Sequence, residues 1–250
     1  MRVLVISDVH GNADALRAVL EDAGRWDDVW VLGDLVDYGP EPQVVVDMVR
    51  ELRPGLVVRG NHDNAVAFGV DCLCDPKVHE LSVYTRQAIS ARLLSREQVE
   101  WLRGLPTTAR KSVDGATYYA VHGSPASPLY GYLYPDMPRE KLLEQLSPPG
   151  LRLSGGARRP VRADVILVGH THLPFSASVD SALVANPGSV GQPRDGVPLA
   201  SYMVLDTEGR RVAHRRVRYD VEAVLRKLAS LGLERRYYDW LARILTSGSI

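Results

Sequence analysis

The chain opens with Met1-Arg-Val-Leu-Val-Ile-Ser-Asp-Val-His-Gly-Asn12, in which a short apolar run gives way to polar residues and a glycine. Val3 to Ile6 is typical of a buried strand, and Ala13 to Asp22 has the spacing of an amphipathic helix. The pattern then repeats with a strand from Asp28 to Leu32, a helix from Pro42 to Leu52 and a strand from Leu56 to Val58. This β-α-β-α-β order predicts parallel strands joined by right-handed crossovers.

The rest of the chain mixes helices with short strands. A helical stretch from about His79 to Arg103 is divided near Ser95, where Ser95 to Gln98 fits a capping box. Thr107 to Val121 is strand-like, with Asp114-Gly115 as its hairpin turn. The later segments are a helix near Arg139 to Leu146, a strand from Val165 to Val168, short strands to about Arg218, and a helical hairpin from Val221 to Leu245 broken at Gly232. We expect one domain containing two sheets.

The composition is that of an ordinary globular protein. Hydrophobic residues make up 45% of the 250 residues, and 30 basic residues balance 30 acidic ones. A dedicated nucleic-acid binder normally carries a basic excess, so strong nucleic-acid binding is not expected. The two cysteines, Cys72 and Cys74, are too few for a disulfide framework and are interpreted as loop or packing residues of a reducing interior. Neither a signal peptide nor a membrane span is recognisable, so we expect a cytoplasmic protein that does not contact membranes.

Five polar motifs follow predicted strands. They are Ser7-Asp-Val-His-Gly-Asn12, Gly33-Asp-Leu-Val-Asp37, Gly60-Asn-His-Asp63, Val121-His-Gly123 and Gly169-His-Thr-His172. Loops beyond the carboxyl ends of strands in open α/β sheets meet in one crevice. We therefore expect these side chains to converge from distant parts of the sequence.

The donor atoms of these motifs are those of a metal centre. Carboxylate and amide oxygens together with imidazole nitrogens suit borderline divalent ions. Because a carboxylate has two oxygens, one aspartate can bridge two cations about 3.5–4 Å apart. Asp34 is our candidate for that bridge. The first site would then consist of Asp8, His10, Asp34 and His172, and the second of Asp34, Asn61, His122 and His170.

Taken in order, the five motifs resemble those of the calcineurin-like metallophosphoesterase superfamily. The pattern of that family is D-x-H, G-D-x-x-D, G-N-H-[DE], a lone histidine and G-H-x-H, and residues 8 to 172 fill every position. The resemblance implies an α/β fold, a four-layer α-β-β-α sandwich of two mixed sheets packed face to face with flanking helices. Within a single domain over 1–250, we expect a helical insertion at about 64–106, a loop-rich insertion at about 123–160 and carboxyl-terminal helices at about 220–246.

The resemblance also implies a reaction, the hydrolysis of phosphate esters with two divalent ions. We expect Mn²⁺ first, with Fe²⁺, Zn²⁺ or Ni²⁺ as alternatives, and attack by a hydroxide that bridges the two ions. His62 lies outside the ligand set, and its counterpart in the family sits beside the metals. We expect His62 to protonate the departing alkoxide or to stabilise the transition state, with Asp37 fixing its tautomer. Asp63 is interpreted as a helix cap.

Residues that could contact substrate are less specific signals. Asn12, beside the first site, and Arg194, in a turn-rich segment after the last histidine pair, are candidate phosphate contacts. A basic cluster is a further candidate, for contact with a second phosphate, and consists of Arg158, Arg159 and Arg162. A group of aromatic residues could stack on a base and consists of Tyr130, Tyr132 and Tyr134.

The substrate itself stays open between several classes. Phosphoprotein phosphatases of the family, and their relatives that cleave dinucleoside polyphosphates, carry an arginine directly after the second aspartate of G-D-x-V-D, where this chain has Tyr38. This difference weakens a protein-phosphatase interpretation and favours a phosphodiesterase or a hydrolase of a small phosphorylated, possibly nucleotide, substrate. Diadenosine tetraphosphate hydrolysis and phosphomonoester hydrolysis stay as alternatives. A non-catalytic interaction scaffold is an alternative of another class, although the chain keeps the full ligand set and His62.

Overall fold

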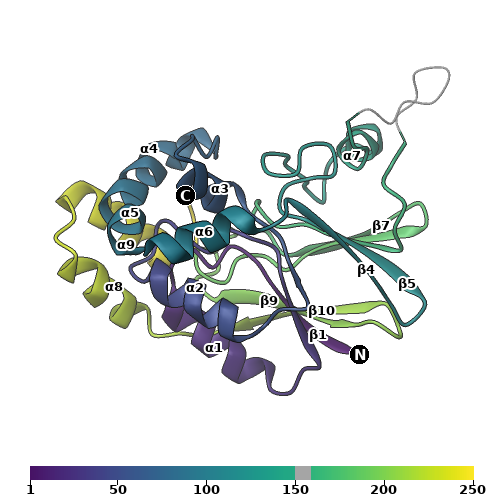
Figure 1. The fold of residues 1–250 in the computed structure, drawn as a ribbon, viewed down its shortest axis with the longest axis horizontal. Coiled ribbons are helices and arrows are strands. Elements are labelled where there is room, and N and C mark those ends of the chain that lie inside the picture. The colour runs from purple at the N-terminus through teal and green to yellow at the C-terminus, as the bar shows by residue number, and fades with distance from the viewer. Residues whose placement is uncertain (150–158) are drawn as a thin grey trace.

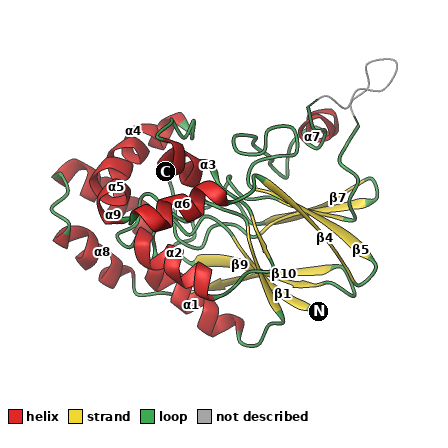
Figure 2. Cartoon of the chain, in the orientation of Figure 1, coloured by secondary structure: helices red, strands yellow, loops and turns green. Residues whose placement is uncertain are grey.

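The structure is a computed structural model that describes residues 1–149 and 159–250. Two five-stranded sheets pack face to face, with most of the helices gathered on one side and at one end of the sheets (Figure 1, Figure 2). No helix of the described residues is long and apolar enough to cross a membrane.

The first sheet carries the predicted β-α-β-α-β unit. Its strand order is β10-β9-β1-β2-β3, formed by Arg211–Val217, Ala200–Asp206, Arg2–Ile6, Asp28–Val31 and Leu56–Val57. Strands β1, β2 and β3 are parallel, as the sequence predicted, and β9 and β10 add an antiparallel edge. The carboxyl ends of β1, β2 and β3 therefore lie along one edge of the sheet.

The second sheet has the order β4-β5-β6-β8-β7. Its strands are Thr108–Val113, Ala116–Val121, Val165–Leu167, Ala182–Asn186 and Phe175–Val179. Strands β5, β6 and β8 are parallel, and β4 joins β5 through the predicted hairpin. At that turn Asp114 and Gly115 both have positive φ, 50° and 72°, as a two-residue hairpin turn requires.

The faces of β1 show why the sheets stack. Val3 and Val5 belong to the core between the two sheets, whereas Leu4 and Ile6 belong to the core under the helices. Across the inter-sheet core, the Trp30 ring meets the Tyr118 ring edge to face at 5.0 Å. Since both faces of the central strands are covered, these strands consist of continuous apolar runs.

Helices cover the outer face of each sheet unequally. Helices α1 (Ala13–Ala23), α2 (Pro42–Glu51) and α6 (Arg96–Gly104) pack on the first sheet. The second sheet is covered by α7 (Arg139–Gln145) and the loops that follow β5, through residues such as Leu133 and Leu146. The expected four-layer sandwich is confirmed, with a thin fourth layer.

A separate group of helices packs beside the sheets. It comprises α3 (Asn61–Phe68), α4 (Pro76–Thr85), the π-helical turn η1 (Arg86–Ser90), α5 (Ala91–Leu93), α8 (Val221–Ser230) and α9 (Arg235–Ser247). The aromatic face of α9 packs inward, and the Tyr237 ring stacks on Tyr84 of α4 at 3.7 Å. The predicted break at Gly232 lies between α8 and α9. Two helix starts differ from the prediction: α4 begins at Pro76 rather than near His79, and the helix expected after Asp63 begins at Asn61.

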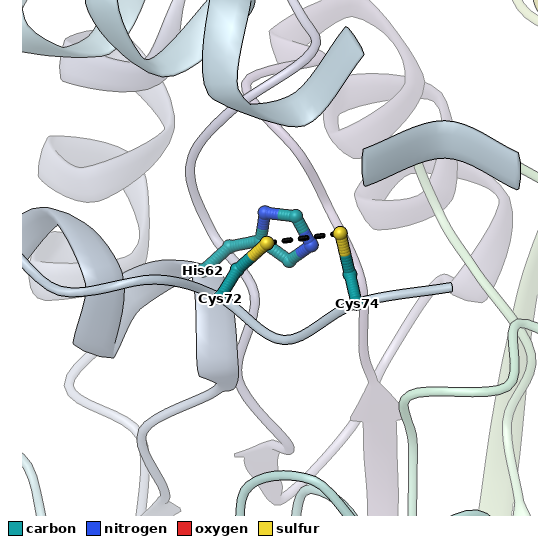
Figure 3. A group of neighbouring side chains, drawn as sticks. All are labelled: His62, Cys72 and Cys74. Carbon is teal, nitrogen blue, oxygen red and sulfur yellow. Dashed lines mark hydrogen bonds between the residues drawn. The ribbon is translucent and has the colours of Figure 1, made fainter. Parts of the chain in front are cut away.

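The loop between α3 and α4 holds both cysteines. Cys72 and Cys74 are free and buried, and they lie beside His62 at the start of α3 (Figure 3). They agree with the prediction of unpaired loop cysteines. Their position also brings two thiols to the edge of the site described next.

Candidate metal centre

The fold brings the five motifs to one place. Asp8 and His10 follow β1, Asp34 follows β2, and Asn61 opens α3 directly after β3. From the second sheet, His122 follows β5, and His170 and His172 follow β6. None of these seven side chains is more than 4% exposed. All seven predicted ligands therefore gather in a buried cluster at the carboxyl ends of strands from both sheets.

The backbone at this cluster is unusual. Left-handed φ angles between 46° and 66° occur at six non-glycine residues of the motifs and at Tyr38, which directly follows one of them. The six are Asp8, His10, Asp34, Asp37, His170 and His172. Such angles are uncommon outside glycine and tend to be held by the surrounding structure at functional sites. Gly60 is required for another reason, because a Cβ there would lie 2.0 Å from the Asp34 Oδ1.

Asp8, His10 and His172 form the first half of the cluster. The Nε2 atoms of His10 and His172 lie 3.2 Å apart, and His172 Nε2 lies 3.3 Å from Asp8 Oδ1. Each imidazole donates its Nδ1–H to a backbone carbonyl, His10 to Val36 at 2.9 Å and His172 to Gln192 at 2.5 Å. These bonds leave the two Nε2 lone pairs facing the same point, as ligands of one cation would.

Asp34, Asn61, His122 and His170 form the second half. His122 Nε2 lies 3.2 Å from Asp34 Oδ2 and 3.0 Å from Asn61 Oδ1. The Asn61 amide donates to the Cys72 carbonyl at 2.8 Å, which turns its oxygen toward the cluster. Asp34 Oδ2 also lies 3.8 Å from His10 Nε2. Asp34 therefore stands between the two halves, where a bridging carboxylate must be.

The cluster fits cations because its acceptors lack partners. Asp8 Oδ1, Asp34 Oδ2 and His170 Nε2 are buried without a hydrogen bond in the described structure. Unpaired buried acceptors are costly, so a native structure normally pairs them with a donor or an ion.

Three of the four candidate histidine ligands carry the charge of a metal ligand. Burial lowers the pKa of His10 to about 3 and that of His170 and His172 well below the usual value. Neutral imidazole is the form that binds metals. His122 differs: burial acts to lower its pKa, but the negative charge of Asp34, 3.2 Å away, outweighs burial and raises that pKa to about 9. This imidazole therefore has to lose a proton to bind a cation.

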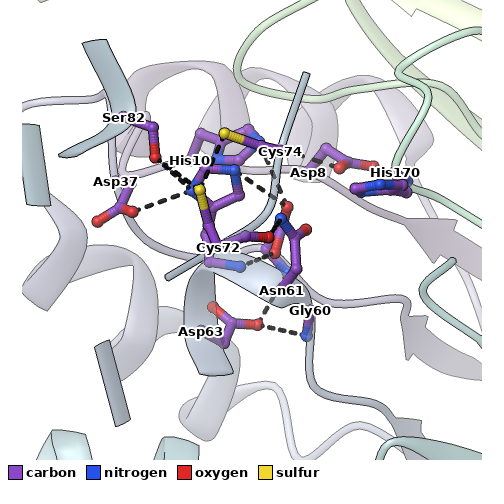
Figure 4. Close-up of polar contacts among 12 residues, drawn as sticks. Asp8, His10, Asp37, Gly60, Asn61, Asp63, Cys72, Cys74, Ser82 and His170 are labelled. Atoms are coloured by element: carbon purple, nitrogen blue, oxygen red, sulfur yellow. Dashed lines mark hydrogen bonds and ion pairs between the residues drawn. The ribbon is translucent and has the colours of Figure 1, made fainter. Parts of the chain in front are cut away.

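His62 stands at the edge of this cluster with Asp37 behind it. Its Nδ1 donates to Asp37 Oδ2 at 2.9 Å, and its Nε2 lies 4.0 Å from Asp34 Oδ2. Figure 4 shows Asp37 and Ser82 on one side of the group, and Asp8 and His170 on the other. Asp37 is fixed by the Ser90 hydroxyl at 2.7 Å and by Arg86 Nε at 3.2 Å. Burial alone would lower the pKa of His62, but the charges of Asp34 and Asp37 raise it above the usual value.

Asp63 holds the backbone of the site together, a role larger than the predicted helix cap. Its two oxygens accept the N–H groups of Asp34 and Leu35 at 2.8 Å and of Gly60 at 2.9 Å. The carboxylate thereby ties the loop after β2 to the start of α3. Sequence reasoning undervalued this residue, and it missed Arg86 and Ser90, which lie in a helical turn outside every motif.

Asn12 and Arg194, the two expected phosphate contacts, differ in their surroundings. Asn12 caps α1 by accepting from Ala15 N at 3.0 Å, and its amide donates to Gly191 O at 3.1 Å. Both polar groups of Asn12 are thus engaged within the protein. Arg194 is held by Gln192 Oε1 at 2.6 Å, beside the Tyr38 ring, which leaves a cation next to the centre.

The basic cluster and the tyrosines lie in different places. Arg159 and Arg162 line a pocket with residues from the outer face of the second sheet, and Arg158 lies outside the described residues. Tyr132 does reach the centre, because its ring lies 4.3 Å from that of His170 and stacks with Tyr134 at 6.0 Å.

An open pocket lies against these two rings. Its volume is about 720 Å³, and its lining consists of Leu73, Cys74, Asp75, Pro76, His79, Tyr132 and Tyr134. The chain therefore places an aromatic pocket next to the cluster of candidate ligands.

Proteins of known sequence or structure resemble this chain over almost all of its length. The crystal structure of a metallophosphoesterase from Sphaerobacter thermophilus matches with a TM-score of 0.78 and 33% identity, covering 99% of this chain and 100% of the other. A protein of Methanocaldococcus jannaschii is 31% identical over 266 residues, covering 98% of each chain. A phosphodiesterase of Escherichia coli is 25% identical over 222 residues, covering 83% of this chain and 89% of the relative.

The family assignment rests on a match to the family as a whole. Residues 1–210 match the calcineurin-like phosphoesterase superfamily domain, a span that contains all five motifs and both sheets up to β9. The chain belongs to the calcineurin-like phosphoesterase superfamily and is a metal-dependent hydrolase of phosphate esters.

Proposed function

We propose that the protein is a dinuclear phosphodiesterase. One ion would be held by Asp8, His10, Asp34 and His172, and the other by Asp34, Asn61, His122 and His170. The observation that carries this proposal is the convergence of three buried acceptors without partners, Asp8 Oδ1, Asp34 Oδ2 and His170 Nε2. Mn²⁺ is the first choice of ion, since a mixed set of oxygen and imidazole donors suits borderline divalent metals.

When bound, the two ions would lower the pKa of a water molecule and neutralise the charge of the phosphate. The residues of the chain hold the candidate ligands in position for these ions. The backbone carbonyls of Leu32, Val36 and Gln192 hold three of the histidine ligands by their Nδ1–H groups, which fixes their tautomers. Burial of the cluster keeps competing water away and strengthens its electrostatics.

We propose that His62 donates a proton to the leaving oxygen. Its Nε2 faces the cluster, while its Nδ1–H is occupied by Asp37. The raised pKa of His62 favours the protonated form that a general acid needs. Asp37 acts as a positioning residue, and Arg86 and Ser90 prevent it from turning away from the imidazole.

A diester of modest size is the substrate class that we propose. The relative from Escherichia coli is named a phosphodiesterase, which supports this class. Tyr38, where phosphoprotein phosphatases have an arginine, is buried with its ring 4.9 Å from that of His10. The guanidinium of Arg194 stands nearby, 6.0 Å from the same ring, and is our candidate contact to a phosphate oxygen.

A dinucleoside polyphosphate is the second candidate, favoured by the aromatic pocket. The Tyr132 and Tyr134 rings are nearly parallel, with an interplanar angle of 11°, and Tyr132 touches His170. A nucleobase stacked there would lie one side chain from the ions. Hydrolysis of a small diester needs no such pocket. The two candidate substrates therefore differ in whether Tyr132 and Tyr134 contribute to substrate binding.

The test is hydrolysis by metal-stripped protein with Mn²⁺ added back. The substrates are bis-p-nitrophenyl phosphate, p-nitrophenyl phosphate and diadenosine tetraphosphate. Metal-dependent turnover that is highest on the first supports the diesterase, and highest turnover on the third supports the dinucleotide hydrolase. No turnover on any of them by protein carrying two ions would overturn the proposal and favour a scaffold.

We also propose that residues 1–250 act as one domain in a reducing compartment. The two sheets share one core, and the helices of 64–106 pack against those of 220–246. The free thiols of Cys72 and Cys74 support the reducing compartment.

A further inference from the structure

The two thiols beside His62 are closer together than their spacing in sequence requires. Cys72 Sγ and Cys74 Sγ lie 2.9 Å apart, and both residues are unpaired. Leu73 between them has φ of 48°, a left-handed angle that is rare for leucine. The same residue is 59% exposed, so burial of its side chain does not explain the turn. The left-handed turn at Leu73 places the two sulfur atoms opposite each other.

One cysteine of the pair faces an open pocket, and the other contacts residues of the candidate metal centre. Cys74 lines the open pocket that also holds Tyr132 and Tyr134, whereas Cys72 beneath it is fully buried. Cys72 Sγ lies 3.2 Å from Ser82 Oγ, which lies 3.3 Å from His62 Nδ1. The Cys72 carbonyl accepts the hydrogen bond that orients Asn61. A small reagent can reach Cys74, and a change at Cys72 reaches both His62 and Asn61.

We propose that Cys72 and Cys74 form a reversible dithiol–disulfide site that is oxidised by a small hydroperoxide. The Cys74 thiol attacks the peroxide, becomes a sulfenic acid and releases the first water or alcohol. The Cys72 sulfur then attacks the Cys74 sulfur, and the hydroxyl of the sulfenic acid leaves as water. In sum, two thiols lose two electrons and two protons, and the peroxide is reduced. A dithiol reductant reverses the reaction by exchange.

A disulfide fits this geometry better than a third metal ion does. The sulfurs need to approach by about 0.9 Å from 2.9 Å to reach the length of a disulfide bond, and the side-chain contacts that this movement loosens are those of Cys72 with Ser82 and of Cys74 with Tyr38. A metal held by both sulfurs and His62 needs a free imidazole nitrogen. Nδ1 of His62 is bound to Asp37, and Nε2 faces Asp34. Metal binding here would therefore break the arrangement that holds His62.

Oxidation would lower hydrolysis, and this consequence rests on the proposed function. Closing the bond draws Cys72 away from Ser82 and shifts the carbonyl that holds Asn61. Because misplacement of a catalytic group by a fraction of an ångström to an ångström lowers rates strongly, we expect turnover to fall by at least about tenfold. The thiol chemistry itself does not depend on the substrate.

The experiment treats Mn²⁺-loaded full-length protein with hydrogen peroxide, removes the excess with catalase, and measures mass, free thiols and hydrolysis. The chain has two cysteines, so the count of free thiols should fall from two to none. The mass should fall by about 2 Da, and dithiothreitol should restore mass, thiols and activity together. The control variants are Cys74→Ser and the double variant Cys72→Ser/Cys74→Ser, with folding checked by circular dichroism. Their hydrolysis should not respond to peroxide by the disulfide route.

Three results would overturn the proposal. Mass gain by added oxygen without loss of two hydrogens would mean that no disulfide forms. Equal inhibition of the double variant would place the oxidation at the metal centre. Protection of both thiols by one equivalent of zinc, with loss of the response to peroxide, would make the pair a metal site instead. If the untreated protein hydrolyses none of the tested esters while mass and thiols change as expected, the proposed function fails and the thiol proposal stands.

Discussion

Replacement of His62 by alanine tests whether this residue acts as a metal ligand or as a general acid. His62 makes no contact that a metal ligand would, since its Nδ1 is bound to Asp37 and its Nε2 lies 4.0 Å from Asp34 Oδ2. Asp37 keeps its bonds to Ser90 and Arg86 when the imidazole is gone. We therefore expect His62→Ala to fold, to bind two ions and to lose only about 1–3 kcal/mol of stability.

The loss of turnover should depend on the leaving group. A general acid contributes about 10²–10⁴-fold, or roughly 3–5 kcal/mol of transition-state stabilisation at 1.36 kcal/mol per factor of ten. An alkyl phosphodiester has a poor leaving group and needs the proton, so His62→Ala should lose that full factor on it. p-Nitrophenolate leaves without a proton, and the variant should lose less than about tenfold on bis-p-nitrophenyl phosphate. The assay is kcat on both substrates, with bound metal measured by mass spectrometry.

Equal losses on both substrates would refute the role as a general acid and leave stabilisation of the phosphate charge as the explanation. Unchanged kcat on both would remove His62 from the mechanism. His214→Ala is the matched control, because it removes an imidazole from β10 whose partner is the backbone carbonyl of Asn186. It should change neither rate by more than about twofold.

Four further outcomes are expected. Asp63→Asn leaves one of three backbone N–H groups without an acceptor. Urea denaturation should show that the free energy of unfolding falls by about 2–4 kcal/mol, and Mn²⁺ titration that the metal affinity falls by roughly 10–100-fold. Removal of metal by a chelator should lower the melting temperature, and Mn²⁺ at about 100 times its Kd should restore about 2.7 kcal/mol of stability; an unchanged melting temperature would contradict the metal centre. The double variant Tyr132→Leu/Tyr134→Leu should raise KM for diadenosine tetraphosphate by roughly tenfold but not for p-nitrophenyl phosphate; equal KM values would exclude a base in the pocket. Burial acts to raise the pKa of Asp28, but the hydrogen bonds from Lys111 and Trp30 outweigh burial and leave that pKa below the usual value. The stability that Asp28 adds is therefore present at neutral pH and is lost as the pH falls through the lowered pKa. Asp28→Asn should lower the free energy of unfolding by about 1 kcal/mol at neutral pH and by nothing in acid.

The elements that position the centre could be predicted from sequence because they follow local rules. The apolar runs Val3 to Ile6 and Val165 to Val168 mark buried strands, and each motif begins where its run ends. Parallel strands then bring the motifs to one edge, so the seven expected ligands required no knowledge of tertiary contacts. The hairpin at Asp114-Gly115 followed from turn chemistry in the same way.

The parts that could not be predicted depend on packing between segments far apart in sequence. Arg86 and Ser90 reach Asp37 across more than 45 residues, and nothing in their own neighbourhood marks them. The helix α3 starts inside a motif because the Asp63 carboxylate caps it from within while binding the loop after β2. The fit between Cys72 and Ser82 likewise exists only after the helices have packed.

The strained backbone of the ligand loops explains why two sheets are needed. Six non-glycine residues of the motifs, and Tyr38 beside them, adopt left-handed φ angles, each of which costs about 1–3 kcal/mol and persists only when its surroundings fix it. The first sheet supplies Asp8, His10 and Asp34, and the second supplies His122, His170 and His172, so each set of loops is anchored by its own apolar strands. The buried carboxylate and imidazole atoms that lack a hydrogen bond, Asp8 Oδ1, Asp34 Oδ2 and His170 Nε2, add a further penalty. The apolar core that the two sheets share offsets these costs, and so both sheets are needed to hold the loops that carry the candidate ligands.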